Sequence, residues 1–213
     1  MLFRSAQVAL TLHAWFDWVG GYCYDPASGT LLDEWTNFGS VEKFAGNAIF
    51  RGIMRTRLTR ADIHERIAYA RSRGFRVCFY FADGMLMGDQ LPHFQPHWSL
   101  RKEGYNWSGP DSCGANHPLN PLVPEVRAFF SGYLDALLAE YGTEIDALVW
   151  DETFYIPAGT RSAAPYRGYP DRAMLTLVRD LTQRVQNFNR DHTTTVAFLT
   201  SDALGLDHVA ADN

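Results

Sequence analysis

An apolar run that stops at two adjacent acids is the feature that most constrains the fold of this chain. In the segment Ile145–Phe154, the run Ala147–Trp150 is followed at once by Asp151 and Glu152. A helical pattern, Leu122–Tyr141, leads into it. A buried parallel strand that ends in acids places them at the edge of the sheet where α/β enzymes carry out their chemistry. The pattern therefore favours an enzyme that works with carboxylates.

Strand-like and helix-like segments alternate along the chain, which predicts the α/β class. The expected strands are Gln7–Trp15, Ala48–Met54, Phe75–Ala82, Ile145–Trp150 and Thr193–Leu199, and the expected helices are Arg60–Ser72, Val123–Tyr141 and Asp171–Asn189. The strands are hydrophobic on both faces, as is typical of parallel strands covered by helices.

The number of strands sets the expected architecture. About five strands are complete by residue 202, whereas a whole (β/α)8 TIM-type barrel takes about 250 residues. We therefore expect residues 1–213 to form a single domain, an incomplete β/α barrel that is the N-terminal part of a longer protein. An open, doubly wound sheet of five strands is the alternative.

Apolar residues recur at helical spacing in each expected helix. They are Ile63, Ile67 and Ala70 in the first helix, Val126, Phe129, Phe130, Tyr133, Leu134, Leu137 and Leu138 in the second, and Met174, Leu175, Val178, Leu181, Val185 and Phe188 in the third. Thr59 and Gly74 are expected to cap the first helix. The segments 20–46 and 85–121 lack periodicity and are predicted as loops, and loops of that length in a compact domain commonly bind or cover ligands.

Composition argues against several classes of protein. Hydrophobic residues make up 46% and charged residues 20%, which is typical of a folded globular chain. The net charge of -5 argues against nucleic acid or an anionic membrane surface as a partner. No apolar run approaches the roughly 20 residues of a membrane helix. Nothing in the composition indicates an oligomeric state.

Cysteine usage and the N-terminus bear on the compartment. Cys23, Cys78 and Cys113 do not make a disulfide framework, although Cys23 and Cys113 could pair. The short apolar run Val8–Ala14 has no cleavage site after it, so no signal peptide is expected. The location stays open: the cytoplasm is favoured, and a secreted chain from which the leader has been removed is the alternative.

Acids at the ends of the expected strands form the candidate catalytic site. They are Asp17, Asp83, Asp151 with Glu152, and Asp202. Helix capping and solvated strand ends are the alternative explanation. Cleavage of a glycosidic bond needs two carboxyl groups, one to protonate the leaving oxygen and one to attack or to activate water. We expect Asp151 and Glu152 to be catalytic, although neighbouring residues of a regular strand point to opposite faces and cannot both face the site. Asp151 is favoured because it comes directly after the apolar run, and Glu152 can act as general acid or base if the strand bends.

Aromatic residues amount to 14% of the chain and gather in the expected loops, where they could pack or stack on sugar rings. The residues expected to contact carbohydrate are His13, Trp15, Asp17, Trp18, Asp83, Trp98, Trp107, Tyr155 and Asp202. A metal site built from His93, His97 and Asp83 is a rival, but the spacing fits no common zinc pattern. No metal and no other cofactor is therefore expected.

Two stretches resemble a known family. IHERIAYARSRGFRVCFYFADG is similar to the third-strand region of TIM-barrel glycoside hydrolases of the alpha-galactosidase-like type. NPLVPEVRAFFSGYLDALLAEYGTEIDALVWDETF resembles the helix and the fourth strand of the same barrels, where the strand ends in Asp. The resemblance covers residues 7–202 and is one of pattern. It implies that Asp151 is the nucleophile or a substrate-binding acid, and that the general acid belongs to a later strand, near the sixth, beyond this chain.

These features together predict a glycoside hydrolase that cleaves O-glycosidic bonds in an oligo- or polysaccharide. The alternative is a non-catalytic carbohydrate-binding barrel or an inactive fragment. Such a protein would keep the aromatic residues but lack a second carboxyl group about 5–10 Å from the first.

Overall fold

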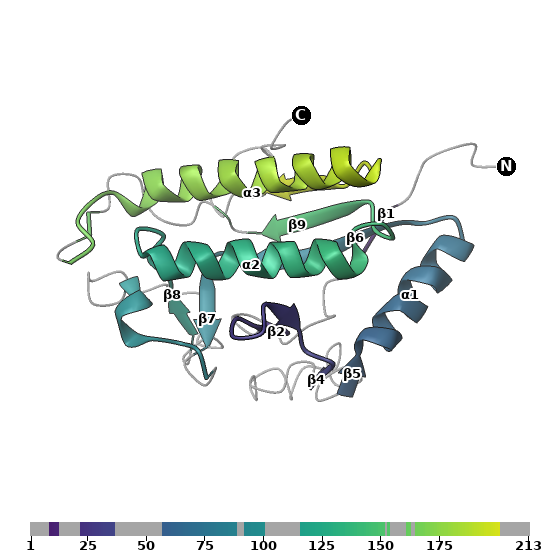
Figure 1. Ribbon diagram of the computed structural model, residues 1–213, viewed down its shortest axis with the longest axis horizontal. Helices are drawn as coiled ribbons and strands as arrows, with labels where there is room; N and C mark the ends of the chain where they lie inside the picture. The colour runs from purple at the N-terminus through teal and green to yellow at the C-terminus, as the bar shows by residue number, and fades with distance from the viewer. Residues whose placement is uncertain are drawn as a thin grey trace, which may run out of the picture.

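The centre of the molecule is a four-stranded parallel sheet (Figure 1). The structure is a computed structural model, and it describes residues 9–12, 22–36, 57–88, 92–100, 116–151, 153, 161–162 and 165–200. Its strands are β1 (Ala9–Leu12), β6 (Arg76–Asp83), β9 (Ala147–Asp151) and β10 (Ala197–Thr200). Three helices accompany it: α1 (Arg60–Ser72), α2 (Pro124–Tyr141) and α3 (Pro170–His192). The predicted α/β class is confirmed.

The strands lie in the order β1-β6-β9-β10, so neighbours in the sheet follow one another along the chain. All three pairings are parallel. β1 and β10 each have one neighbour, so the described strands form an open sheet and not a closed barrel. The expected strand Ala48–Met54 lies outside the described residues.

Two helices, α2 and α3, lie side by side across one face of the sheet (Figure 1). The predicted inward residues of α1 and α2 are all buried. In α3 the prediction is wrong at Leu175, which is 47% exposed, because the inward stripe runs through Met174, Leu177, Val178, Leu181 and Val185. That i, i+3, i+4 spacing places Leu175 about 100° away from Met174 around the helix. The described residues contain no candidate membrane-spanning helix.

Aromatic rings join α2 to the sheet. Phe130 of α2 stacks on Trp150 of β9 with ring centroids 5.5 Å apart. Tyr133 of α2 stacks on Phe81 of β6 at 5.2 Å, and Phe81 also meets Phe198 of β10 edge-on at 5.6 Å. Each such pair contributes about 0.5–1.5 kcal/mol beyond the apolar area that it buries. One helix is thereby attached to three strands through a single aromatic layer.

The face of the sheet opposite α2 and α3 is partly exposed. Its residues include Val149, which is half-buried, and Leu199 of β10, which is 39% exposed. Ala9 and Ala197, at the two outer strands, are also exposed. The strands are therefore apolar on both faces, as the sequence indicates, but the two faces are not equally covered.

Short antiparallel pairings involve parts of the two segments predicted as loops, and one of them also uses residues just before α1. β2 (Tyr24–Asp25) pairs with β3 (Thr30–Leu31), β4 (Glu34–Thr36) with β5 (Arg57–Thr59), and β7 (Leu86–Gly88) with β8 (Asn116–Pro118). A short 3-10 helix, η2 (Pro96–Trp98), follows β7 in the chain. The β2–β3 turn is closed by Asp25, whose carboxylate accepts hydrogen bonds from the backbone N–H groups of Ala27 and Ser28.

The ends of the elements follow local capping chemistry. Thr59 and Asp62 form a capping box at the start of α1, and Gly74, with a φ of 83°, follows its C-cap. Thr193 ends α3 in the left-handed conformation, with a φ of 56°. The strand predicted from Thr193 therefore begins only at Ala197.

Cys23 and Cys78 are free, buried thiols, so the Cys23–Cys113 disulfide considered from the sequence is not formed. Burial raises the pKa of the Cys23 thiol. Cys78 lies inside β6, where it behaves as a small apolar residue.

A histidine held between two carboxylates joins α1 to α2. The Nδ1 atom of His64 lies 3.0 Å from a carboxylate oxygen of Glu144, and its Nε2 atom lies 3.0 Å from Oε1 of Glu140. Arg60 donates to the other oxygen of Glu140 at 3.1 Å. Burial alone would lower the pKa of His64, but the hydrogen bonds to Glu144 and Glu140 outweigh it and raise the pKa. Both ring nitrogens can donate only in the charged form.

This arrangement predicts a pH-dependent stability. Because the pKa of His64 is higher in the folded protein than in the unfolded chain, its contribution is complete below about pH 6.5 and is lost as the pH rises through the raised value. We expect His64→Gln to lower the free energy of unfolding near pH 6 by about 1 kcal/mol or less, since the imidazole is 35% exposed, and by a smaller amount near pH 9.

Urea denaturation of both proteins across this pH range measures the difference. His97→Gln, at an exposed histidine, is the control and should leave the pH profile unchanged. A wild-type-to-variant difference that does not vary with pH would contradict the prediction.

Gly132 allows Tyr24 to pack directly on the backbone of α2. A Cβ atom at this position would collide with the Tyr24 hydroxyl, and Tyr24 is held against Phe129 by an edge-on ring contact. Alanine is the better helix former by about 1 kcal/mol, but overpacking costs about 1–3 kcal/mol. We predict that Gly132→Ala lowers the free energy of unfolding, and that adding Tyr24→Phe recovers part of the loss. A variant more stable than the wild type would refute this packing constraint.

Candidate active site

The carboxyl end of β9 is held in place by Trp150. Besides stacking on Phe130, the indole Nε1–H of Trp150 donates to the backbone carbonyl of Gly84 at 2.7 Å. Neighbouring residues of a strand point to opposite faces of the sheet. Because Trp150 faces α2, Asp151 faces the other side, where it is partly buried.

Tyr80 of β6 contacts Asp151 on that second face. Its hydroxyl donates a hydrogen bond to Oδ2 of Asp151 at 3.1 Å. The backbone partner of Tyr80 on β9 is Val149, two residues before Asp151 and therefore on the same face. Tyr80 itself is only 4% exposed. The carboxylate of Asp151 is thus hydrogen-bonded to a buried phenol hydroxyl of the neighbouring strand.

A β-bulge brings a second acid of the chain into register with Asp151. Tyr80 pairs with Val149, but the next pair is Ala82 with Trp150, so Phe81 is an extra residue in β6. Asp83 is consequently the cross-strand partner of Asp151, and regular pairing would have put Ala82 there. The backbone N–H of Gly84 donates to the carbonyl of Asp151 at 2.8 Å and ties the two strand ends together. Bulges are over-represented next to active sites.

Most other residues predicted for the site lie outside the described residues. They are His13, Trp15, Asp17, Trp18, Trp107, Glu152, Tyr155 and Asp202, together with the side chain of Asp83. Of the five acids expected at four strand ends, the structure therefore describes Asp151 in full and Asp83 by its backbone. These two occupy adjacent positions at the same edge of the sheet.

Trp98 belongs to the packed interior. Its side chain is 7% exposed and part of the main apolar cluster. Its indole Nε1–H is buried and has no hydrogen-bond acceptor among the described residues. This burial favours the packing role for Trp98 over the sugar-stacking role, which stays a prediction.

The histidines of the rival metal site contact different aromatic rings. His93 stacks on Phe129 at 5.0 Å, and burial lowers its pKa, an effect that the charge of Asp25 partly offsets. His97 stacks on Tyr166 at 6.3 Å. Within the described part of the chain, no three His, Cys, Asp or Glu side chains are grouped to hold a metal ion.

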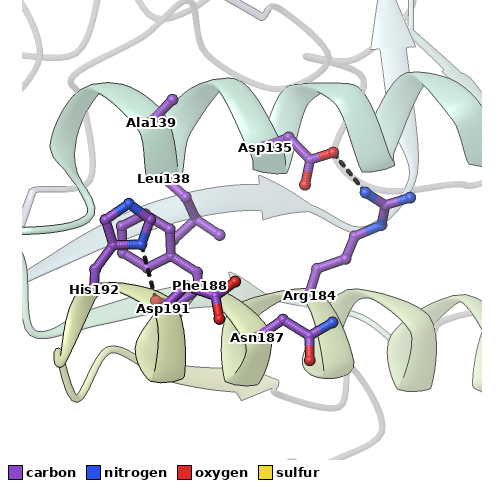
Figure 2. A pocket seen from close by; sticks show the side chains of 8 residues that line it. All are labelled: Asp135, Leu138, Ala139, Arg184, Asn187, Phe188, Asp191 and His192. Atoms are coloured by element: carbon purple, nitrogen blue, oxygen red, sulfur yellow. Dashed lines mark hydrogen bonds and ion pairs between the residues drawn. The ribbon is translucent and has the colours of Figure 1, made fainter.

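A shallow groove of about 360 Å³ lies between α2 and α3, in the helical layer (Figure 2). Its floor includes Leu138 and Phe188, and the ring of His192 stacks on Phe188 at 4.1 Å. At its rim Arg184 forms an ion pair with Asp135 at 2.5 Å. The helices α2 and α3 cover the face of the sheet on which the Trp150 side chain lies, whereas Asp151 lies on the opposite face. The groove is therefore separate from the Asp151 site.

Tyr80 is a site residue that the sequence pattern does not reveal. It lies within the aromatic run Phe79–Phe81, which predicts a buried strand. Only the alternation of faces could have separated Tyr80 from its two phenylalanine neighbours, and only the register places it beside Asp151.

No family model matches the chain, and no curated protein matches it. One similar solved structure is a variant of the GH36 alpha-galactosidase AgaA from Geobacillus stearothermophilus, in complex with 1-deoxygalactonojirimycin. The identity is 16%, the TM-score is 0.41, and the match covers 63% of this chain and 18% of that chain. The chain thus has a weak, partial structural similarity to a glycoside hydrolase.

Proposed function

We propose that this chain is the part of a glycoside hydrolase that carries the catalytic Asp151, and that the enzyme cleaves O-glycosidic bonds of an oligo- or polysaccharide. The observation that carries the proposal is the position of Asp151. It ends a central parallel strand, faces away from α2, accepts a hydrogen bond from Tyr80 and is the cross-strand partner of Asp83. Acids at the carboxyl ends of parallel strands are where α/β enzymes place their catalytic groups.

The strand order supports a barrel as the complete architecture. In a β/α barrel each strand pairs with the next one along the chain, as β1, β6, β9 and β10 do. A doubly wound sheet instead reverses its strand order at a switch point. The apolar, partly exposed face that carries Val149 and Leu199 is then the inner face of an arc of the barrel.

The proposed reaction proceeds in two displacements. A carboxylate oxygen of Asp151 donates an electron pair to the anomeric carbon, while the bond to the glycosidic oxygen breaks. Glu152, the second catalytic residue that we propose, protonates that oxygen as it leaves; this role requires the chain to bend after β9 ends at Asp151, so that the two neighbouring side chains reach the same bond. It then removes a proton from water, which attacks the anomeric carbon and releases Asp151.

A second acid of the chain has its backbone directly across from Asp151. Asp83, predicted to bind substrate, is the cross-strand partner of Asp151, and in-register residues on neighbouring strands lie about 4.8 Å apart along the backbone. Retaining glycosidases need two carboxyl groups about 5–5.5 Å apart. We therefore propose Asp83 as a further candidate for the second carboxyl group, which the non-catalytic carbohydrate-binding alternative would lack.

Replacement of Asp151 tests the proposal. Nitrophenyl glycosides of several sugars are first used to find a substrate of the wild-type protein. We expect Asp151→Asn to lower turnover by more than about 1,000-fold because the amide oxygen is a poor nucleophile. Asp180→Asn, on the exposed side of α3, is the matched control and should leave turnover unchanged.

Rescue by azide separates a nucleophile from a binding residue. In Asp151→Gly, azide can occupy the space of the missing carboxylate and attack the anomeric carbon, so the product is a glycosyl azide. Unchanged turnover in Asp151→Asn would refute the role of Asp151. Sugar binding by the wild type without hydrolysis of any glycoside would favour the carbohydrate-binding alternative.

A further inference from the structure

We infer that Tyr80 is the positioning residue for Asp151, which it orients toward the substrate; this inference rests on the proposed function. The Tyr80 hydroxyl donates to Oδ2 of Asp151 at 3.1 Å. An aspartate at the end of a strand can turn about two side-chain bonds. A hydrogen bond from a fixed donor to one carboxylate oxygen limits that rotation and sets the direction in which the carboxylate faces.

The donor is itself held firmly. Tyr80 is 4% exposed, lies in the middle of the eight-residue strand β6, and pairs through its backbone with Val149. Its ring has two rotatable bonds, and the hydroxyl position follows from them. Asp151 lies two residues beyond Val149, about 6.6 Å along the strand. A tyrosine that leans along the strand spans this distance and ends in a donor.

Tyr80 is the one residue of the aromatic run Phe79–Phe81 that carries a hydroxyl. Phe79 and Phe81, on either side of Tyr80, are fully buried and contact rings of α2. Tyr80 faces the opposite side of the sheet, where Asp151 lies. Phenylalanine would fill the same space against Val149 without the cost of burying a hydroxyl, which must be hydrogen-bonded. Through its hydroxyl, Tyr80 can hold the carboxylate of Asp151, which phenylalanine could not do.

The β-bulge of β6 places the Tyr80–Asp151 hydrogen bond next to the proposed catalytic position. Because Phe81 is the extra residue, Tyr80 keeps its partner Val149 while Asp83 moves into register with Asp151. One strand thus supplies both the donor that orients Asp151 and the acid opposite it. A misplacement of a reacting group by about 1 Å can cost about 100-fold in rate.

Tyr80→Phe tests this inference with a readout that a purely structural role would not change. The probe is an activated fluorosugar with a fluoride leaving group. An Asp151 oxygen forms a bond to its anomeric carbon, fluoride leaves with the electron pair of the broken bond, and intact-protein mass spectrometry follows the glycosylated enzyme. We expect the rate constant of trapping to fall about 10- to 100-fold while the dissociation constant of the fluorosugar stays unchanged.

Tyr69→Phe is the matched control, because it removes the same hydroxyl from a tyrosine that is 62% exposed on α1. It should trap the fluorosugar at the wild-type rate. If Tyr80→Phe also traps at the wild-type rate, the positioning role is overturned while the proposed function stands. A loss of affinity in place of a loss of rate constant overturns it as well.

A second measurement does not depend on glycosidase activity. The NMR resonance of the Asp151 side-chain carboxyl carbon should shift in Tyr80→Phe and stay in place in Tyr69→Phe. If the wild type is not trapped by any fluorosugar, the proposed function fails, and this resonance alone decides whether Tyr80 holds Asp151. A resonance that does not move overturns the inference.

Discussion

The stacking of Trp150 on Phe130 is the contact on which the arrangement of the candidate site depends. A strand has two faces, and the direction of one residue determines the direction of its neighbours. With Trp150 packed against α2, Asp151 must face the side of the sheet that α2 and α3 leave open. The hydrogen bond from the Trp150 indole to Gly84 adds the neighbouring strand to the same fixed unit. One face of β9 thus packs in the apolar core, and the opposite face carries the proposed catalytic residue.

Local signals in the sequence predict the helices and central strands well, because capping residues and apolar periodicity act over a few positions. The capping box at Thr59 and the inward face of α2 are examples. The pairing of β7 with β8 could not be predicted in this way, since Leu86 and Pro118 are brought together from far apart in the chain. At Leu175 the hydrophobic character of a single residue suggests burial, whereas the direction of the helix face decides its exposure.

In the candidate site, too, the features set by local sequence can be predicted, and the features set by strand pairing cannot. Asp151 can be predicted because an apolar run of strand length ends at it. Its relation to Asp83 depends on the extra residue at Phe81, and its contact with Tyr80 depends on the pairing of β6 with β9. Register is a property of two strands together, so neither relation is visible in one strand alone. Trp98 lies in a segment predicted as a loop, yet its side chain is only 7% exposed, because exposure depends on what packs against a loop and not on the loop itself.

The irregularity in β6 also has an evolutionary consequence. A point substitution changes which side chain occupies a position, but it cannot change which backbone position stands across from the end of β9. In a regularly paired strand Ala82 would stand opposite Asp151, and an acid would have to replace it; the gain of one residue brings Asp83 to that position without any substitution. Relatives of this chain should therefore be aligned with a one-residue gap allowed inside this strand, where gaps are ordinarily forbidden, or homologous acids will be matched to alanines.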